Sequence, residues 1–463
     1  MNKLRIMLAI IAGKLGIILS RMLGNQGTDF PGRIALKVYP GLLKKLSANI
    51  SIAKIIVTGT NGKTTTTNML ARILKENGHS FIHNQAGANM ISGITTAFIE
   101  QANLTGTKKF NYALLETDEA NVPLLLKQTG AHYLLVTNFF RDQLDRYGEL
   151  DHTISLIKEA VKGTGIKLIL NADDPLMADF QPQTSLRCWY YGFGDTPYDR
   201  SDSEENREGR YCVFCGHELR YRSYHYAQLG QFECPACHNR NPQVDFTGSE
   251  LELTPGISLR INEMEIESPY QGFYNAYNVL AAVSLARVLS IPETVIKRAI
   301  AGFHPQAGRM EEFIIAGKRT ILILVKNPAG LNQTLSSLAY DPVCKNVFFA
   351  LNDNAADGRD ISWIWDADVE FISNQDLNIG QFICSGQRSG DIAVRMKYAG
   401  VETSRINIRT PLQEGIETAI ARESEAVYIL STYTALFECR KILVKLQRQW
   451  GKGQAAVSAR SVE

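Results

Sequence analysis

Short apolar runs, each followed by a stretch with helical periodicity, dominate the chain from about residue 53. The first run, Ile55–Thr58, precedes a helical stretch at Thr64–Lys75. Runs at Tyr112–Leu115, Tyr133–Val136 and Leu168–Leu170 repeat the pattern. Strands that alternate with helices predict an α/β fold, a parallel sheet with helices on both faces. Such sheets bind ligands at the carboxyl ends of their strands, so the residues directly after each run are the informative ones.

The same pattern predicts how the chain is divided. A polar, turn-rich segment at 195–211 leads into a small separate unit, and a Pro/Gly-containing stretch at Gly302–Glu312 indicates a hinge. Later strands are expected at Leu251–Leu253, Ile257–Ile261, Thr320–Val325, Val347–Leu351, Phe382–Cys384 and Ala426–Leu430, with a helix at Asn275–Leu289. We therefore expect an N-terminal helical segment (1–50), a central domain (51–312) with an insert at 205–245, a smaller Rossmann-like α/β domain (313–450) and a disordered tail (451–463).

The N-terminal segment is apolar but regularly interrupted by charge. Residues 1–23 contain Lys3, Arg5, Lys14 and Arg21. A secretory signal is not expected, because Lys14 divides the apolar core and no small-residue cleavage site follows. Two interpretations remain open: a helix packed on the protein or a partner, and a helix lying at a membrane surface with its basic side chains among the headgroups.

Composition and charge narrow the class of protein. The chain has 463 residues, 45% of them hydrophobic, with 49 basic and 47 acidic side chains. The near-equal numbers of basic and acidic side chains argue against a dedicated nucleic-acid-binding protein. No apolar run reaches the ~18 residues that a membrane-spanning helix needs. We expect a soluble protein of about three domains.

A phosphate-binding loop is the strongest local signal. Residues 57–67 read VTGTNGKTTTT, which places a glycine turn between a predicted strand and a predicted helix. Backbone N–H groups of such a turn and the helix N-terminus bind phosphate oxygens, a lysine neutralises them, and a threonine hydroxyl suits Mg²⁺. The candidate nucleotide-binding residues are Gly59, Thr60, Asn61, Gly62, Lys63, Thr64 and Thr65.

Acidic residues follow two of the other predicted strands. Glu116, Asp118 and Glu119 come after Tyr112–Leu115, whereas Asn138, Asp142 and Asp145 come after Tyr133–Val136. Each alone fits a cap or a solvated loop, but their shared position favours Glu116 as a ligand of Mg²⁺.

Two Cys-x-x-Cys pairs lie in the insert. Cys212 and Cys215 precede Cys234 and Cys237 by a spacing that is typical of a structural, tetrahedral zinc site. The alternatives to a zinc site are four free thiols or two disulfides. A basic, aromatic edge at 220–224 leaves nucleic-acid binding open as a function of this unit. None of the four remaining cysteines lies in a nucleophile elbow, so we interpret all four as buried cysteines: Cys188, Cys344, Cys384 and Cys439.

Six segments, in order, resemble the Mur ligases and folylpolyglutamate synthetases: TGTNGKTTT, LLETDEA, TNFFRDQLDRYGE, NADDP, GFYNAYNVLAA and AGRMEE. Those enzymes phosphorylate a carboxylate with ATP and let an amine attack the acyl phosphate. The resemblance implies that Lys63 and Thr64 hold phosphates and Mg²⁺, and that Glu116 holds a second Mg²⁺. It also implies that Asn171, Asp174 and Asn275 surround the adenine and that Arg309 reaches a phosphate from the hinge.

Other features depart from the stem-peptide ligases. Only about 53 residues precede the first strand, too few for a nucleotide-sugar-binding domain, and Gln143 replaces a metal-binding histidine. VKNPAGLNQT and ALNDNAADGRDISWIWD (350–366) instead resemble MurT-type subunits of lipid II isoglutaminyl synthase.

That resemblance implies ATP-dependent amidation of the D-glutamate α-carboxylate in lipid II, with ammonia supplied by a GatD-type glutaminase subunit bound to residues 313–450. It also implies that Asp353, Asp357 or Asp360 completes the partner's Cys–His pair, in a cytoplasmic protein at the inner membrane face. A folylpolyglutamate-type peptide ligase, a zinc-ribbon ATPase that acts on nucleic acid, and a non-catalytic scaffold are the alternatives.

Overall fold

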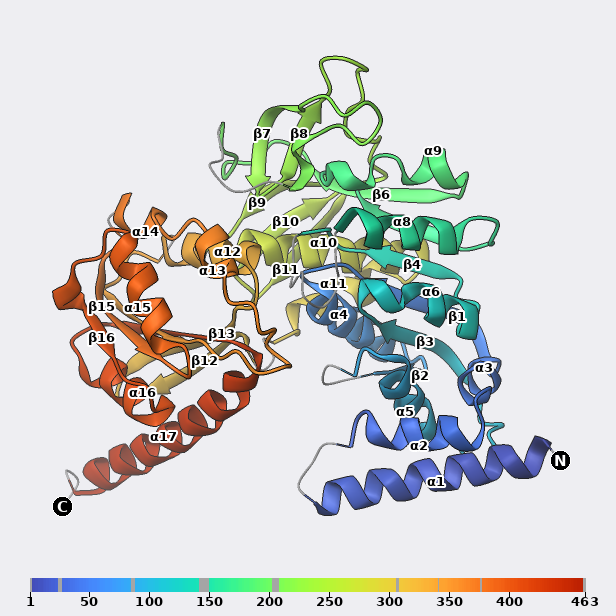
Figure 1. The fold of residues 1–463 in the computed structure, drawn as a ribbon, viewed down its shortest axis with the longest axis horizontal. Helices are drawn as coiled ribbons and strands as arrows, with labels where there is room; N and C mark the ends of the chain where they lie inside the picture. Colours follow the sequence, from blue (N-terminus) through green and yellow to red (C-terminus); the bar gives the residue numbers. More distant parts are fainter. Residues whose placement is uncertain are drawn as a thin grey trace.

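The computed structural model describes residues 2–23, 27–84, 88–140, 150–201, 208–304, 308–339, 341–374 and 377–460. Two α/β bodies lie side by side, with a small β-hairpin unit on the first and a layer of N-terminal helices beneath it (Figure 1).

A nine-stranded sheet forms the first body. Its strand order is β11-β10-β9-β6-β5-β4-β1-β3-β2, parallel from β2 to β9 and antiparallel across β9, β10 and β11. The strands are β1 (Ile50–Thr58), β2 (Phe81–His83), β3 (Phe110–Glu116), β4 (Tyr133–Val136), β5 (Lys167–Asn171), β6 (Cys188–Phe193), β9 (Phe246–Glu252), β10 (Ile257–Ile261) and β11 (Met264–Ser268). The predicted parallel sheet is confirmed by these pairings. Central strand β1 pairs with β3 and β4, so residues that follow all three strands share one edge of the sheet.

Helices cover both faces of this sheet because its buried strands are apolar on both sides. Along β1, Ile55 and Val57 belong to one hydrophobic core and Ile56 to the other. The first core is closed by α4 (Lys63–Glu76), α10 (Phe273–Val288) and α11 (Glu293–Ala301). The second is closed by α1 (Asn2–Met22), α2 (Phe30–Val38), α3 (Leu42–Ser47), α5 (Ile91–Gln101), α6 (Val122–Thr129), α8 (Leu150–Val161) and α9 (Phe180–Thr184).

A six-stranded sheet forms the second body. Its order is β12-β13-β17-β14-β15-β16, parallel except for β12 against β13. The strands are β12 (Arg309–Ile315), β13 (Lys318–Leu324), β14 (Lys345–Ala350), β15 (Ile379–Ser385), β16 (Ile406–Ile408) and β17 (Ala426–Ser431). The helices are α12 (Pro328–Ala339), α13 (Trp363–Asp366), α14 (Phe371–Asn374), α15 (Ser389–Tyr398), α16 (Leu412–Ala421) and α17 (Tyr433–Arg460).

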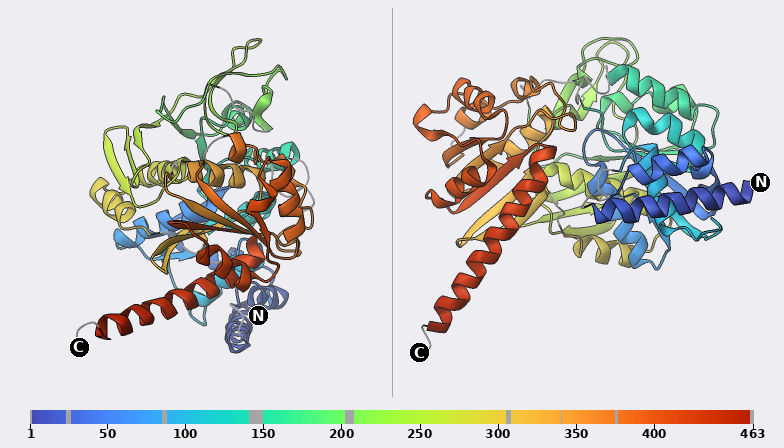
Figure 2. Two further views of the ribbon diagram at one scale, coloured as in Figure 1. Left: turned by 90° about the vertical axis from the view of Figure 1, so that its left-hand side faces the viewer. Right: turned by 60° about the horizontal axis from the view of Figure 1, so that its bottom comes forward.

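Two boundaries differ from the sequence-based prediction. Strand β12 already pairs within the second sheet, so this body begins at Arg309 rather than at 313. Helix α17 continues to Arg460, into the segment expected to be disordered, since residues 454–460 (QAAVSAR) are mostly good helix formers. It projects from the second body in both views of Figure 2.

The N-terminal segment is helical, as the pattern predicted. Helix α1 packs on α2 and α5 through Ile6, Ala9, Ile10 and Ile17, which are buried. Within the described part of the chain, every helix is too short or too polar to cross a membrane.

Candidate active site at the junction of the two bodies

The phosphate loop connects the end of β1 to the start of α4, as predicted. Gly59 (φ 120°) and Gly62 (φ 85°) have left-handed backbone conformations. A Cβ on Gly59 would lie 2.2 Å from Thr137 Oγ1, so glycine is needed for close approach to β4 as well as for the turn. The loop is fixed from the next strand end, since Asn138 accepts hydrogen bonds from the N–H groups of Thr60 and Asn61, both at 2.9 Å.

Lys63 lies buried at the start of α4. Its Nζ donates to the carbonyl oxygen of Gly59 at 2.5 Å and lies 3.6 Å from carboxylate oxygens of both Asp118 and Glu119. The carboxylates after β3 therefore face the lysine directly. The ammonium group is held at the loop, where it can neutralise phosphate charge.

Glu116, at the end of β3, forms a pair with Thr64. The Thr64 hydroxyl donates to Glu116 Oε1 at 2.8 Å, and Arg309 Nη2 approaches Thr64 Oγ1 at 3.5 Å. Burial raises the pKa of Glu116, whereas the Thr64 hydrogen bond and the charges of Lys63 and Arg309 lower it. A hydroxyl and a carboxylate together are oxygen ligands that suit Mg²⁺.

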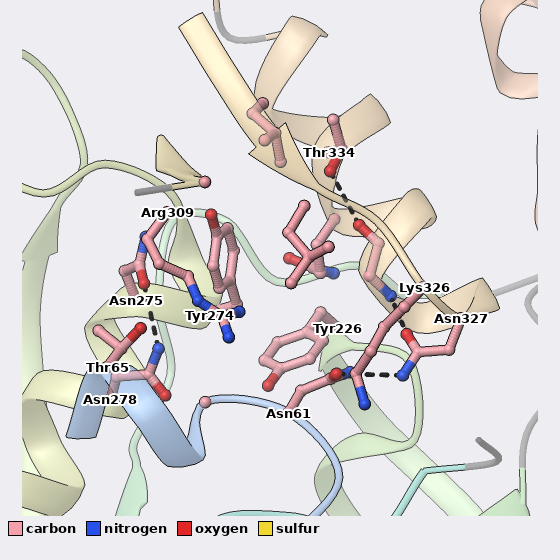
Figure 3. A pocket seen from close by; sticks show the side chains of 16 residues that line it. Asn61, Thr65, Tyr226, Tyr274, Asn275, Asn278, Arg309, Lys326, Asn327 and Thr334 are labelled. Atoms are coloured by element: carbon pink, nitrogen blue, oxygen red, sulfur yellow. Dashed lines mark hydrogen bonds between the residues drawn. The ribbon is translucent and has the colours of Figure 1, made fainter. Parts of the chain in front are cut away.

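A cavity of about 660 Å³, including its part open to solvent, lies between the two bodies (Figure 3). Of the predicted residues, Asn61, Gly62, Thr65, Asn275 and Arg309 line it. The predicted hinge residue and the phosphate loop thus share one cavity.

The second body completes this cavity with residues of the VKNPAGLNQT segment. Asn327 Nδ2 donates to Asn61 Oδ1 at 3.1 Å, and Lys326 and Thr334 point toward the same space in Figure 3. This contact between domains places a lysine and an amide opposite the phosphate loop.

One aromatic lining residue could not be predicted. Tyr226 ends β7 (Arg220–Tyr226) of the hairpin unit, which β8 (Leu229–Glu233) completes, and its side chain lies across the cavity from Tyr274 (Figure 3). Its ring packs against Phe140 at 5.7 Å between centroids. Because the insert has no counterpart among the recognised motifs, no spacing pointed to this tyrosine.

Asn171 and Asp174 lie at the end of β5, fully buried and outside the lining of the cavity. Asp174 accepts hydrogen bonds from the N–H groups of Phe139 (2.8 Å) and Leu176 (3.2 Å), and burial raises its pKa to about 6. Both side chains shape the loops beside the cavity, and their contact with adenine stays a prediction.

The four cysteines of the insert converge. The sulfur atoms of Cys212, Cys215, Cys234 and Cys237 all lie within 4.8 Å of one another, the only such ligand group among the described residues. Sγ of Cys212 is 3.5 Å from that of Cys237, and Sγ of Cys215 is 3.4 Å from that of Cys234. None of the eight cysteines forms a disulfide.

The basic, aromatic edge of this unit is part of its own packing. Tyr221 stacks on Tyr224 at 4.2 Å, Tyr224 is buried, and the Tyr221 hydroxyl donates to carbonyl oxygens of Gly209 and Gln228. These tyrosines therefore take part in the packing of the unit, whereas the side chains of Arg220 and Arg222 are exposed, and nucleic-acid binding by this edge stays an open alternative.

The three candidate aspartates follow β14 in the second body. Asp357 is buried and accepts hydrogen bonds from the N–H (2.7 Å) and the hydroxyl (2.5 Å) of Thr434, at the start of α17. The Asp353 side chain is 32% exposed and pairs with Arg388 at 3.2 Å, and Asp360 is exposed. Asp357 is thus the only one of the three that is buried, whereas Asp353 pairs with a side chain at the surface and Asp360 accepts a hydrogen bond from the N–H of Ser362 at 2.8 Å.

Asp142, Gln143 and Asp145 lie outside the described residues, so the expectations for them are untested.

Known proteins match nearly the whole chain. The Mur ligase middle domain family matches residues 57–235, and the MurT ligase C-terminal family matches residues 324–436. The MurT subunit of lipid II isoglutaminyl synthase (glutamine-hydrolyzing) from Staphylococcus aureus strain COL is 38% identical over 96% of this chain and 99% of its own length. The subunit of the same name from Streptococcus pneumoniae R6 is 36% identical over 96% of this chain and 98% of its own.

Solved structures share the fold. A pseudomurein peptide ligase type C from Methanothermus fervidus has a TM-score of 0.66 at 23% identity and covers 86% of this chain and 80% of its own. A MurF ligase from Thermotoga maritima in complex with ADP has a TM-score of 0.62 at 14% identity, with 90% and 84% covered. With its Mur ligase fold and its near-complete match to the two bacterial subunits, the chain belongs to the family of MurT subunits of lipid II isoglutaminyl synthase.

Proposed function

We propose that this chain amidates the α-carboxylate of D-glutamate in the lipid II stem peptide, giving D-isoglutamine in an ATP-dependent step of peptidoglycan synthesis. The observation that carries the proposal is the single cavity shared by the phosphate loop, Arg309 and the MurT-type C-terminal body. The relatives are named as subunits of a glutamine-hydrolysing enzyme, which supports ammonia as the attacking amine.

ATP would lie with its triphosphate on residues 59–65 and its base toward Asn275 and the two cavity tyrosines. Lys63 neutralises the outer phosphates, and Arg309 and Lys326 approach them from the second body. Thr64 and Glu116 form the donor set for Mg²⁺, which when bound would offset the negative charge of the phosphate oxygens.

The chemistry then proceeds in two displacements. A carboxylate oxygen of the substrate attacks the γ-phosphorus in line, the bond from that phosphorus to the β–γ bridging oxygen breaks, and ADP leaves. Ammonia attacks the acyl carbon, phosphate leaves, and the nitrogen loses a proton to give the amide. The Asn327–Asn61 contact closes the second body over the loop, which keeps water from hydrolysing the acyl phosphate.

Zinc fits the four-cysteine cluster. Tetrahedral Zn–S bonds of about 2.3 Å require sulfur atoms about 3.8 Å apart, close to the 3.4 Å and 3.5 Å measured for two of the pairs. Four sulfurs leave no position for a catalytic water, so the site would be structural. It would hold the insert that carries Tyr226, whose neighbour Gln228 donates to the carbonyl oxygen of Phe139.

Ammonia must come from another protein, a GatD-type glutaminase. Burial raises the pKa of Cys188, Cys384 and Cys439 to about 12, so these thiols are not nucleophiles at neutral pH. Cys344 does not lie in a nucleophile elbow. A separate subunit docked on the second body supplies the nucleophilic cysteine.

Asp353 or Asp360 is the better candidate to complete the partner's catalytic residues, because Asp357 already holds the start of α17. Burial raises the pKa of the Tyr433 phenol, and the carboxylates of Asp357 and Glu116 raise it further. The start of α17 is therefore near enough to both carboxylates to interact with them. A glutaminase docked on this loop would therefore release ammonia close to the acyl phosphate.

Mass spectrometry of a lipid-linked muropeptide tests the proposal. With Mg·ATP and ammonium we expect the change of one carboxyl to an amide, and loss of that product in Lys63→Ala. Lys75→Ala, an exposed lysine of the same helix, is the matched control and should remain active. Product only when an amino acid replaces ammonium would identify a peptide ligase and overturn the proposal.

A further inference from the structure

Helix α1 carries a second apolar face that the fold does not use. Leu4, Leu8, Leu15, Ile18, Leu19 and Met22 are between 48% and 79% exposed, on the side of the helix opposite the buried Ile6, Ala9, Ile10 and Ile17. Spacings of three and four residues place the exposed set in one stripe. Phe30, at the start of α2, is also 54% exposed. We call these seven side chains the outer face of α1.

The segment around this face is strongly basic. Residues 1–50 contain eight lysines and arginines and one acidic residue, Asp29, whereas the other 413 residues contain 41 basic and 46 acidic ones. Lys3, Arg5 and Arg21 are exposed on α1 itself. Positive charge is thus concentrated where the apolar stripe is exposed, although the chain as a whole is near neutral.

We propose that the outer face of α1 binds the surface of an anionic phospholipid bilayer. An amphipathic helix of this kind lies in the interface plane, its apolar side chains at the boundary of headgroups and acyl chains and its basic side chains at the phosphates. The inner face of α1 is packed on α2 and α5, so the whole body would be held at the membrane rather than a loose tail.

The outer face is joined to the reaction site through short contacts. Phe30 follows Asp29, whose carboxylate accepts a hydrogen bond from Ser92 Oγ in the first turn of α5. Just before α5, Asn89 Nδ2 donates to Asp118 Oδ1 at 2.7 Å, and Asp118 faces Lys63. The next step rests on the proposed function: membrane binding by the outer face of α1 would bring a lipid-linked substrate to the site from the membrane side.

Vesicle flotation of the purified full-length chain tests the inference without any substrate. We expect binding to vesicles of equal parts phosphatidylglycerol and phosphatidylcholine, weak binding to pure phosphatidylcholine, and loss of binding as salt is raised. The triple variant Leu8→Gln, Leu15→Gln, Leu19→Gln should partition at least roughly tenfold less, since three apolar anchors are lost. The matched control changes three exposed leucines outside α1 to glutamine, namely Leu104, Leu124 and Leu156. This control variant should bind vesicles like the unaltered chain.

Thermal melts of both triple variants show whether each is folded. Equal binding by the α1 triple variant and the unaltered chain, or no binding of the unaltered chain to anionic vesicles, would overturn the inference. A concentration-dependent dimer that the α1 triple variant abolishes would assign the face to a second copy instead. Amidation of detergent-dispersed substrate by that variant would show that the proposed function stands whichever result is obtained.

Discussion

Replacing Gly62 by alanine tests how the phosphate loop is built. Gly62 has φ 85°, and a Cβ there would lie 2.0 Å from Oδ1 of Asn278 on α10. Asn278 would have to move, and its hydrogen bonds with Asn275 (3.0 Å) and Thr66 (3.4 Å) would be lost. The substitution therefore combines backbone strain with displacement of a residue that lines the cavity.

The magnitude follows from these contributions. A left-handed conformation costs an alanine about 1 kcal/mol, and each lost hydrogen bond costs about 1 kcal/mol. If the total of about 3 kcal/mol falls on the loop conformation that binds phosphate, the affinity for Mg·ATP drops about 100-fold. Titration calorimetry with Mg·ATP measures this change directly.

Gly163 provides the matched control, since it has φ 67° but no atom within 4 Å of a built Cβ. Gly163→Ala should lower the melting temperature slightly and leave ATP affinity unchanged. Adding Asn278→Ala to Gly62→Ala removes the clash and should recover part of the lost affinity. The reasoning is refuted if Gly62→Ala binds ATP as Gly163→Ala does, or if the second change recovers nothing.

Changes at the cysteine cluster, at Glu116 and at the aspartates after β14 test other parts of the site. Cys215→Ser, or treatment with a metal chelator, should lower the melting temperature and weaken ATP binding, because the unit that carries Tyr226 loosens. Unchanged ATP affinity would contradict this. Burial raises the pKa of Glu116, so the folded state binds the proton of this carboxyl group more tightly than the unfolded state does. The free energy of unfolding therefore falls as the pH rises above the ordinary pKa of glutamate. Glu116→Gln should flatten that fall in melting curves while abolishing ATP turnover. Asp357→Asn should cost about 1 kcal/mol of stability at the start of α17, whereas Asp353→Asn should leave melting unchanged and reduce glutamine-driven amidation in the complex with the partner.

Local sequence signals were sufficient to predict the phosphate loop and the strands around it, whereas β2, β6 and β11 of the same sheet were not predicted. Apolar runs such as Ile55–Thr58 and Ala426–Leu430 lie within β1 and β17, because a strand buried on both faces leaves an uninterrupted apolar run. The loop was predictable for a different reason: its glycines are required by positive φ and by close approach to β4. Carboxylates placed after β3 then meet the loop because parallel strands end at the same edge.

Features that depend on long-range packing were not predictable. Tyr226 reaches the cavity from an insert whose position on the sheet no local pattern defines. The buried state of Asp174 follows from contacts with Phe139 and Gln228, which are distant in sequence. Nor does helical periodicity alone distinguish the packed face of α1 from its outer face, since both are apolar.

Transfer of oxygen from the substrate carboxylate to inorganic phosphate reports whether an acyl phosphate forms in the cavity between the two bodies. A muropeptide labelled with ¹⁸O in the D-glutamate α-carboxylate is incubated with the chain, a GatD-type glutaminase, Mg·ATP and glutamine. Attack of the carboxylate on the γ-phosphorus predicts that each amide formed is matched by one ¹⁸O in inorganic phosphate. Amide formation with unlabelled phosphate would contradict an acyl phosphate, and with it the role assigned to the cavity between the two bodies.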